Sequence, residues 1–513
     1  MEKRSRKPSV KLNFLYNMGY QIFTMIVPLI TTPYISKVLL AEGVGRYSYT
    51  YSIVNYFVLF AQLGFDYYAQ REIAKVQGKK NEQSIIFFEI MLVKLLTVGI
   101  SSSVYITLCL SGLFGDYTVL MWCWLILILA QQFDIAFIFK GNEEFSKIVI
   151  RNLFIKIAGI VAIFMFVKTK EDTWIYVLCF SISNFLGVFT TWAYLPKYIC
   201  RVKLKELKPM KHFWPAVRLF IPTIASMLYA YLDKTLIGVL IKETYTESQS
   251  VVVDGVAQTT EVVKKYSDLE NGFYEQSEKI VKIGMSVITA LGAVMLPRNA
   301  KENATGNSFK LKENIYIASR FVMLIGIPIM LGLIGLADNL IPWFLGNGFE
   351  KSITYLRLFC PLVVLIGFDN VFGMQYLMAT GRDKQYTIAV VSGTLVNMIF
   401  NIVFIPSLWG YGAIIASVIS QVVVVTIMYV YIRKEISLWK IINSGVKYVI
   451  AGCVMLGVML LTQSYMQPSF VNTLILIGEA VIIYAIMIIV LRDRFIIENM
   501  RKIREKVFKK KTI

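Results

Sequence analysis

Two stretches that lie far apart in the chain match each other and decide the architecture. "GRYSYTYSIV" covers residues 45–54 and "GFYEQSEKIV" covers residues 272–281, and glycine, tyrosine, isoleucine and valine coincide between them. A second match joins "FDIAF", which starts at Phe133, to "FDNVF", which starts at Phe368. The matches follow the same order in both halves of the chain. The sequence therefore predicts two copies of one structural unit.

The composition indicates that both copies lie in a membrane. Of the 513 residues, 56% are hydrophobic and 17% are charged, and the mean hydropathy is +0.61. A soluble protein carries roughly a quarter charged residues. Apolar runs of about 20 residues, each long enough to span a bilayer as a helix, recur along the chain. We expect an all-α polytopic membrane protein with about fourteen transmembrane helices, near residues 12–36, 45–67, 84–110, 117–139, 149–168, 173–195, 213–241, 272–297, 314–337, 353–378, 385–406, 410–432, 443–463 and 470–491.

The repeat and the basic residues predict the arrangement of these spans. Each copy holds an even number of spans, so the copies are expected to be parallel, pseudo-symmetric six-helix bundles around a central site, which is a common transporter plan. Lys and Arg concentrate on one side, which places both termini in the cytoplasm by the positive-inside rule. The predicted domains are an N-terminal bundle (1–200), a C-terminal bundle (201–437), two additional helices (438–492) and a basic tail (493–513).

The second copy carries an insertion at residues 242–271 on the expected outer face. Alternating valines in "SVVVDGVAQTTEVV" are compatible with a small hairpin. A variable surface loop without a catalytic role is the favoured interpretation of this segment.

Several function classes fit the sequence poorly. The net charge is +20, but the basic residues lie in short loops between spans, which argues against nucleic-acid binding. The six cysteines are scattered without a CxxC pair, and His212 is the single histidine, so we expect no His/Cys metal site. We find neither a nucleophile–base pair nor a phosphate-binding glycine loop, and we expect the chain not to be an enzyme. The first span follows a basic start but has no small-residue cleavage site, so it is expected to be retained.

Four charged residues mark the candidate site. Glu275, Glu278, Lys279 and Lys282 are spaced i, i+3, i+4 and i+7, which places them on one face of a helix. Charge deep in a membrane is costly and normally faces a water-filled cavity or a partner. This favours a cavity. The alternative is structural neutralisation within the helix, through the i,i+4 pairs Glu275–Lys279 and Glu278–Lys282.

The seventh span and the first copy supply the other expected walls of the cavity. Asp233 shares a helix face with Ser226 and Tyr229, and it could pair with Lys279 or Lys282. The first copy has neutral residues where the second has charges, which predicts a cavity with one charged wall. These neutral equivalents are Ser48, Tyr51, Ser52 and Asn55.

Three further charged residues inside spans have open roles. Lys94 either contributes to the cavity or extends its long side chain to the cytoplasmic interface. Asp134 and Asp369 occupy matched positions near span ends, and we favour a structural, helix-end role for both.

Three motifs together resemble a known family. "YLDKTLIG" from Tyr231, "GFYEQSEKIVKI" from Gly272, and "FGMQYLMATGRDKQYTIAVVSGTLVNMIFNIVFIP" from Phe372 are similar to the bacterial polysaccharide-transport, or O-antigen flippase, family. This family belongs to the multidrug/oligosaccharidyl-lipid/polysaccharide (MOP) exporter superfamily, and the resemblance covers essentially the whole chain. The chain departs from the family pattern at Gln421, where many members have Glu, and at Ala136, where an aromatic residue is frequent.

The resemblance implies a MATE-like fold in a bacterial cytoplasmic (inner) membrane. It implies a flippase that moves undecaprenyl-pyrophosphate-linked oligosaccharide units to the outer leaflet for surface polysaccharide synthesis. It also implies that Asp233, Lys234, Glu275, Glu278, Lys279 and Lys282 lie on the family's charged seventh and eighth helices.

As a mechanism we expect alternating access, with Lys279 and Lys282 attracting the pyrophosphate and the hydroxyl and amide groups binding the sugar. The expected partners are this lipid-linked sugar, the bilayer and polysaccharide assembly proteins, without a cofactor, and H⁺ or Na⁺ coupling stays open. The alternatives are a drug/cation antiporter of the same superfamily and a membrane-embedded polymerase or glycosyltransferase.

Overall fold

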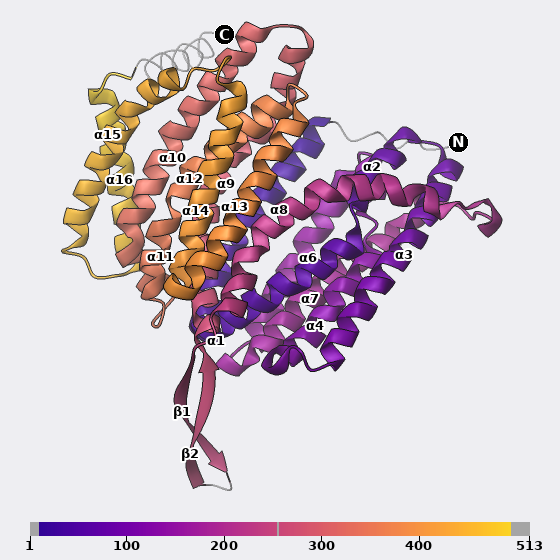
Figure 1. Ribbon diagram of the computed structural model, residues 1–513, viewed down its shortest axis with the longest axis horizontal. Helices are drawn as coiled ribbons and strands as arrows, with labels where there is room; N and C mark the ends of the chain where they lie inside the picture. The colour runs from indigo at the N-terminus through magenta and orange to yellow at the C-terminus, as the bar shows by residue number, and fades with distance from the viewer. Residues whose placement is uncertain (1–9, 254–255, 494–513) are drawn as a thin grey trace, which may run out of the picture. The chain divides into compact units, whose positions relative to one another are not determined.

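A computed structural model describes residues 10–253 and 256–493 of the chain, and it is helical apart from one hairpin (Figure 1). The all-α fold class is therefore confirmed. The longer elements are α1 (Val10–Gln62), α2 (Phe65–Lys75), α3 (Lys80–Leu110), α4 (Thr118–Phe133), α5 (Ala136–Gly141), α6 (Phe145–Phe166), α7 (Thr173–Phe189), α8 (Phe213–Leu240), β1 (Thr244–Val253), β2 (Val256–Lys265), α9 (Tyr266–Ala304), α10 (Ser308–Phe344), α11 (Lys351–Phe359), α12 (Pro361–Asp369), α13 (Asp383–Leu408), α14 (Gly410–Ile432), α15 (Leu438–Gln463) and α16 (Phe470–Val490). The short helical turns are η1 (Gly115–Tyr117), η2 (Lys170–Asp172), η3 (Thr190–Lys197), η4 (Leu204–Glu206), η5 (Pro209–His212) and the π-helix η6 (Asn370–Met378).

The predicted spans agree with the observed helices. Among the described residues, 11 helical segments are long and apolar enough to cross a membrane. The longest, α1, joins the first two predicted spans across a kink at Leu40, whose φ is 57°. The expected span at 353–378 is built from α11, α12 and η6 in succession. The chain is therefore an integral membrane protein.

The chain forms two compact units, which we describe separately. Unit 1 contains Met1–Glu275 and Asn401–Gly410, and unit 2 contains Gln276–Phe400 and Tyr411–Ile513. The boundaries fall inside α9, inside α13, and directly after the first residue of α14. The predicted division at residues 200, 437 and 492 stays a prediction, and residues 494–513 of the expected basic tail lie outside the described residues.

In unit 1 the two matched stretches cross each other at their glycines. A β-carbon added to Gly45 of α1 would lie 1.6 Å from the carbonyl oxygen of Asp268 in α9. One added to Gly272 of α9 would lie 1.9 Å from the carbonyl oxygen of Ala41 in α1. Ala41 and Asp268 each precede their glycine by four residues, so the two contacts are equivalent under the sequence repeat. Only glycine permits this backbone approach.

The insertion forms the hairpin that its valines allowed. β1 and β2 pair antiparallel from Thr244↔Lys265 to Val253↔Val256, and the hairpin projects away from the helices of unit 1 (Figure 1). At its base, Lys264 forms ion pairs with Glu42 of α1 and with Glu247. The base of the hairpin is therefore attached to α1, on which part of the candidate site lies.

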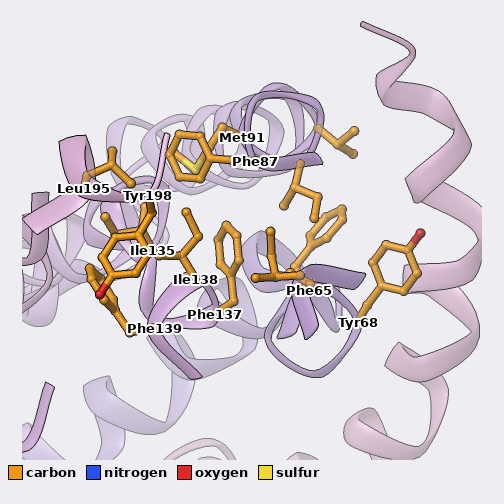
Figure 2. Packing of buried hydrophobic residues seen from close by; sticks show 14 of the residues in the cluster. Phe65, Tyr68, Phe87, Met91, Ile135, Phe137, Ile138, Phe139, Leu195 and Tyr198 are labelled. Atoms are coloured by element: carbon orange, nitrogen blue, oxygen red, sulfur yellow. The ribbon is translucent and has the colours of Figure 1, made fainter. Parts of the chain in front are cut away.

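Aromatic packing stabilises the opposite end of unit 1. Phe65 and Tyr68 of α2, Phe87 of α3, and Phe137 of α5 belong to one buried cluster (Figure 2). α5 is a short helix after the break at the end of α4, and it fills the space between α2 and α3 with three consecutive buried side chains, Phe137, Ile138 and Phe139. In unit 2, α10, α15 and α16 share a separate apolar core.

Candidate substrate site

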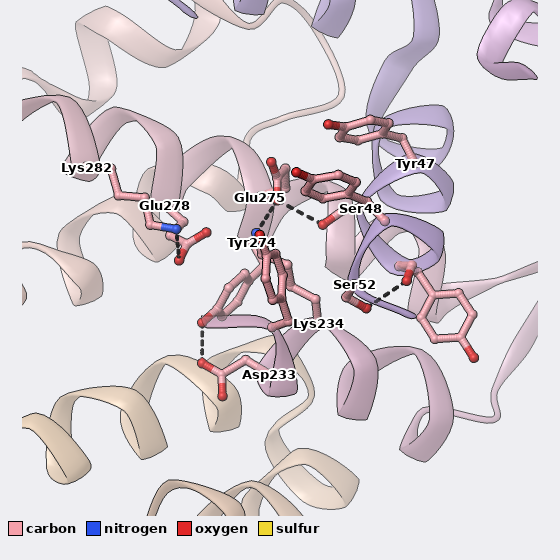
Figure 3. A network of polar contacts seen from close by, with 12 residues as sticks. Tyr47, Ser48, Ser52, Asp233, Lys234, Tyr274, Glu275, Glu278 and Lys282 are labelled. Carbon is pink, nitrogen blue, oxygen red and sulfur yellow. Dashed lines mark hydrogen bonds and ion pairs between the residues drawn. The ribbon is translucent and has the colours of Figure 1, made fainter. Parts of the chain in front are cut away.

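A buried ion pair links three helices of unit 1. The Lys234 ammonium of α8 donates to Oε2 of Glu275 in α9, and both side chains are buried. The Ser48 hydroxyl of α1 donates to the same carboxylate at 2.9 Å (Figure 3). Ser48 and Glu275 are matched positions of the repeat, so this contact lies one helical turn beyond the glycine crossing. A buried ion pair is tolerated only when further hydrogen bonds satisfy it, which Ser48 helps to provide.

Asp233, the residue before Lys234, binds two neutral donors. The Tyr274 hydroxyl of α9 donates to Oδ2, and the Asn401 amide of α13 donates to Oδ1 at 2.6 Å. Tyr274 and Glu275 are adjacent in α9, as Asp233 and Lys234 are in α8. We call Ser48, Asp233, Lys234, Tyr274, Glu275 and Asn401 the polar network.

The first-copy residues take several roles. Ser52 and Thr235 lie 2.8 Å apart and join α1 to α8, and Tyr56 bonds the same Thr235 at 3.0 Å. Asn55 donates to the carbonyl of Tyr51 within its own helix. The Tyr51 ring lies in an aromatic cluster with those of Tyr47, Trp124, Phe180 and Tyr231. Ser48 and Ser52 are therefore placed to connect helices, whereas Asn55 is bonded locally.

The part of α9 that belongs to unit 2 carries the remaining charges. Lys282 pairs with Glu278 at 2.7 Å, an i,i+4 contact (Figure 3). The Lys282 side chain is 52% exposed and that of Glu278 is 16% exposed. One of the two alternative intrahelical pairs is thus present. The described partners of Glu275 are Ser48 and Lys234, and the pairing of Asp233 with Lys279 or Lys282 stays a prediction.

Lys94 is buried within unit 1. Its side chain is 2% exposed, and its ammonium donates to the carbonyl oxygen of Asp134 at 2.7 Å. The break between α4 and α5 supplies this buried carbonyl acceptor, and the choice between the two roles given for Lys94 stays a prediction. The Asp134 carboxylate accepts from the amide of Ala136 at 2.9 Å, which is the helix-end role we favoured.

Four other residues that the sequence singled out have outcomes of different kinds. In unit 2, the Gln421 side chain of α14 donates to the Asp369 carboxylate of α12 at 3.1 Å, so this hydrogen bond links the two helices. Tyr229 is half-buried on α8. The side chain of Ser226 lies outside what the structure describes.

Sequence reasoning missed three members of the site. Tyr274 lies inside the motif that defined the repeat. It was not predicted because only the charged residues of that helix were considered as site residues. Asn401 follows Asn397 by one turn in an apolar segment, and polar residues inside a membrane helix are a signal of function. Thr235 had no signal of its own, because threonine is common in membrane helices.

The arrangement offers hydrogen bonding and charge rather than bond-breaking chemistry. Hydroxyls, amides and ion pairs from α1, α8, α9 and α13 gather inside unit 1. Among the residues that the structure describes, no three His, Cys, Asp or Glu side chains gather as metal ligands do.

Known proteins share this sequence and fold. The polysaccharide biosynthesis protein family matches residues 10–302, more than half of the chain, and a second match of the same description covers residues 256–354. A protein of Escherichia coli (strain K12) that is named as an O-antigen transporter is 21% identical over 438 residues, which are 84% of this chain and 98% of that one.

Solved structures extend the likeness to the fold. The lipid II flippase MurJ, in an inward closed conformation, matches with a TM-score of 0.69 at 16% identity, over 94% of this chain and 100% of that one. An inward-facing multidrug resistance MATE family transporter of the MOP superfamily matches with a TM-score of 0.59 at 15% identity, over 80% and 98%. These relatives are transporters and flippases, so the expectation of a non-enzyme is confirmed. The chain belongs to the polysaccharide biosynthesis protein family, with the membrane fold of the MOP superfamily.

Proposed function

We propose that the protein is a flippase that moves undecaprenyl-pyrophosphate-linked oligosaccharide units from the cytoplasmic to the outer leaflet. The family match and the relatives named as an O-antigen transporter and a lipid II flippase support this proposal. The product would feed surface polysaccharide assembly. The protein would lie in the bacterial inner membrane with both termini in the cytoplasm.

The observation that carries the proposal is the polar network inside the helices. Polar groups cost several kcal/mol each when they enter an apolar medium without a hydrogen-bond partner. A lipid-linked sugar carries many of them, so a path across the membrane must supply replacements for water. Ser48, Ser52 and Tyr274 bring hydroxyls, and Asn401 brings an amide, to the interior of unit 1.

Lys282 and Lys279 are the proposed contacts for the pyrophosphate. Lys282 lies far from both ends of α9, yet half of its side chain is exposed. An ammonium at that depth requires water or an anion. The Lys282 side chain stays 52% exposed in its ion pair with Glu278. Phosphate oxygens can therefore reach the ammonium and take the place of the carboxylate. Transport would then proceed by alternating access, while Asp233 and Glu278 are the carboxylates available for any H⁺ coupling.

A drug/cation antiporter is the second candidate, because MATE transporters share this fold. A site for organic cations favours acidic and aromatic walls. Here Lys234 already neutralises Glu275, and Lys282 pairs with Glu278. The described charges therefore favour an anionic substrate.

The test is to delete the gene in its host and to follow the lipid-linked sugar with an impermeant label on intact cells. We expect loss of surface polymer, with the sugar-lipid accumulating on the unlabelled, inner side. Restoration by the wild-type gene and by Lys282→Arg, but not by Lys282→Ala, would support the role of that charge. Lys301→Ala, which removes an exposed lysine near the end of the same helix, is the matched control.

Two outcomes would contradict the proposal. Sugar-lipid that accumulates in the labelled, outer leaflet would place the defect after translocation. Unchanged polymer in a host without a second flippase would reject the polysaccharide substrate. Normal export by Lys282→Ala would remove Lys282 alone from the mechanism.

A further inference from the structure

Unit 2 contains a cavity with several charged lining residues, and none of them belongs to the polar network. Its volume is about 600 Å³, and it lies where α10 and α15 begin. The lining residues are Phe309, Lys312, Glu313, Tyr316, Ile317, Arg320, Glu435, Lys440 and Ser444. We propose that this cavity, here called the headgroup pocket, binds the phosphate headgroup of an acidic phospholipid.

The beginnings of two membrane helices provide the first argument. Lys312 follows the start of α10 by four residues and Lys440 follows the start of α15 by two, and neither helix has an acidic residue in its first turn. The N-terminal end of a helix carries a partial positive charge that favours anions. Lysines placed there add repulsion, and a bound phosphate would relieve it. Basic pockets between membrane helices are the typical sites of acidic lipid headgroups.

The other charges of the pocket already have partners. Arg320 donates to Asp493 at 2.7 Å and to the Tyr448 hydroxyl at 2.8 Å. Glu435 is paired with Arg382 at 2.7 Å and also accepts from Tyr376. Arg320 and Glu435 are therefore each paired with an opposite charge within the protein.

Lys312 and Lys440 are left facing the pocket. Neither has an ion pair within 4.0 Å in the part of the chain that the structure describes, and the Lys440 ammonium lies 5.8 Å from the ring centroid of Tyr316. Glu313 is the one acidic lining residue without a described partner, and it is exposed to solvent. Two lysines against one exposed carboxylate leave the pocket net positive.

The surroundings of the pocket distinguish a lipid from a free anion. Phe309, which lines it, is 79% exposed, and Trp439, which precedes Lys440, is 74% exposed. Trp and Tyr are enriched where membrane helices meet the headgroup layer, and Tyr316 also lines the pocket. A cationic cavity beside exposed apolar side chains fits an amphiphile, whose phosphate enters the pocket while its acyl chains stay in the bilayer. Free phosphate could use only the cationic part.

The test uses the full-length protein in detergent, titrated with dioleoyl phosphatidylglycerol or dioleoyl phosphatidylcholine and observed by native mass spectrometry. We expect tighter binding of the first phosphatidylglycerol molecule. A basic residue near an acidic lipid is worth about fivefold in affinity, so the Lys312→Ala/Lys440→Ala variant should lose roughly 25-fold. Its affinity for phosphatidylcholine should not change.

The matched control is Lys301→Ala/Lys434→Ala, which removes the same charge from exposed positions outside the lining. An equal loss in this control, or none in the pocket variant, would overturn the proposal. A third titration uses inorganic phosphate. If phosphate binds as tightly as phosphatidylglycerol, the acyl chains contribute nothing and the site is one for a free anion. The result does not depend on which substrate the protein transports, because binding is measured without transport.

Discussion

Glu275 contacts both Lys234, its ion-pair partner, and Ser48, its equivalent in the first copy of the repeat. Its removal should lower the stability of the protein. It accepts from Lys234 and from Ser48, and both charged side chains are buried. Glu275→Ala breaks the described ion pair of the buried Lys234 ammonium, and breaking a buried pair by removing one partner costs about 3–5 kcal/mol. We expect the melting temperature of the purified protein to fall strongly in this variant. Ser48→Ala removes one hydrogen bond to a charged group and should cost only about 1.5–3 kcal/mol.

A double variant separates the cost of an unpaired charge from the worth of the pair. Replacement of both partners, as Lys234→Met/Glu275→Leu, removes the two charges together. Apolar replacements of a buried pair are often neutral for stability. The double variant should therefore melt above Glu275→Ala. If the melting temperature of the double variant is equal to or lower than that of Glu275→Ala, the charged side chains stabilise the fold through other contacts as well as through their pairing with each other.

His212 provides a pH-dependent contact outside the spans. The ring lies at the end of η5, where Nδ1 is 2.8 Å from the Tyr68 hydroxyl and Nε2 is 2.9 Å from Glu89. Burial lowers the pKa of His212 below its ordinary 6.5, although Glu89 opposes this shift. Lys211 also lowers the pKa, and Glu72 raises it. The folded protein thus favours the neutral ring.

The sign of the stability change follows from that direction. A folded-state pKa below the unfolded value contributes stability at pH above about 6.5, and this is lost as the pH falls through the folded-state pKa. We expect the melting temperature to fall between about pH 7 and pH 5, and to fall less in His212→Gln, whose amide cannot take up a proton. Identical pH profiles for the two proteins would show that other groups cause the decrease.

At the scale of elements, the crossing of α1 and α9 depends on two glycines. Added β-carbons would collide with backbone carbonyl oxygens, and backbone cannot move aside as a flexible side chain can. Gly45→Ala and Gly272→Ala should each cost at least about 1–3 kcal/mol, because the helices must separate. Separation would also weaken the Ser48–Glu275 bond one turn away. Thermal unfolding of the purified variants measures the effect.

Gly99→Ala in α3 is the matched control for this crossing. Gly99 also lies within a membrane helix, but no heavy atom lies within 4 Å of the position that an added β-carbon would take. Alanine there should be neutral or stabilising by about 0.5–1 kcal/mol. If the crossing variants melt like Gly99→Ala, the close approach of α1 and α9 is not required for stability.

The elements also show what could be predicted from the sequence. Hydropathy was sufficient for the helices, since only segments of that length and composition can satisfy their backbone in lipid. The kink at Leu40 and the π-helix η6 had no such signal, because they depend on packing. Ser48 and Glu275 were paired as equivalents, but their direct contact was not foreseen. Equivalence under a repeat does not reveal where the two copies cross.

At the scale of the whole molecule, the repeat was visible because its backbone contacts demand particular residues. Gly45 and Gly272 stay recognisable since each must admit a carbonyl oxygen of the other copy. The partners of charged residues were less predictable, because a long side chain reaches several acceptors. Lys234 was seen as part of a motif, yet the only individual partner considered for Glu275 was Lys279 of its own helix, as the alternative to a cavity role. Contacts between helices depend on rotation and depth, which one sequence leaves open.

The orientation of the chain in the membrane is the remaining expectation at this scale. The hairpin precedes α9, and Lys434 follows α14; five predicted spans separate them, so the two positions should face opposite sides. Cysteines introduced at Ser248 and Lys434, which are both exposed, can report this in a chain whose six native cysteines are replaced by alanine. We expect an impermeant maleimide to label Ser248→Cys in intact cells and Lys434→Cys only after permeabilisation. The reverse pattern would invert the topology and place the headgroup pocket at the outer leaflet, and labelling of both in intact cells would contradict the odd number of crossings.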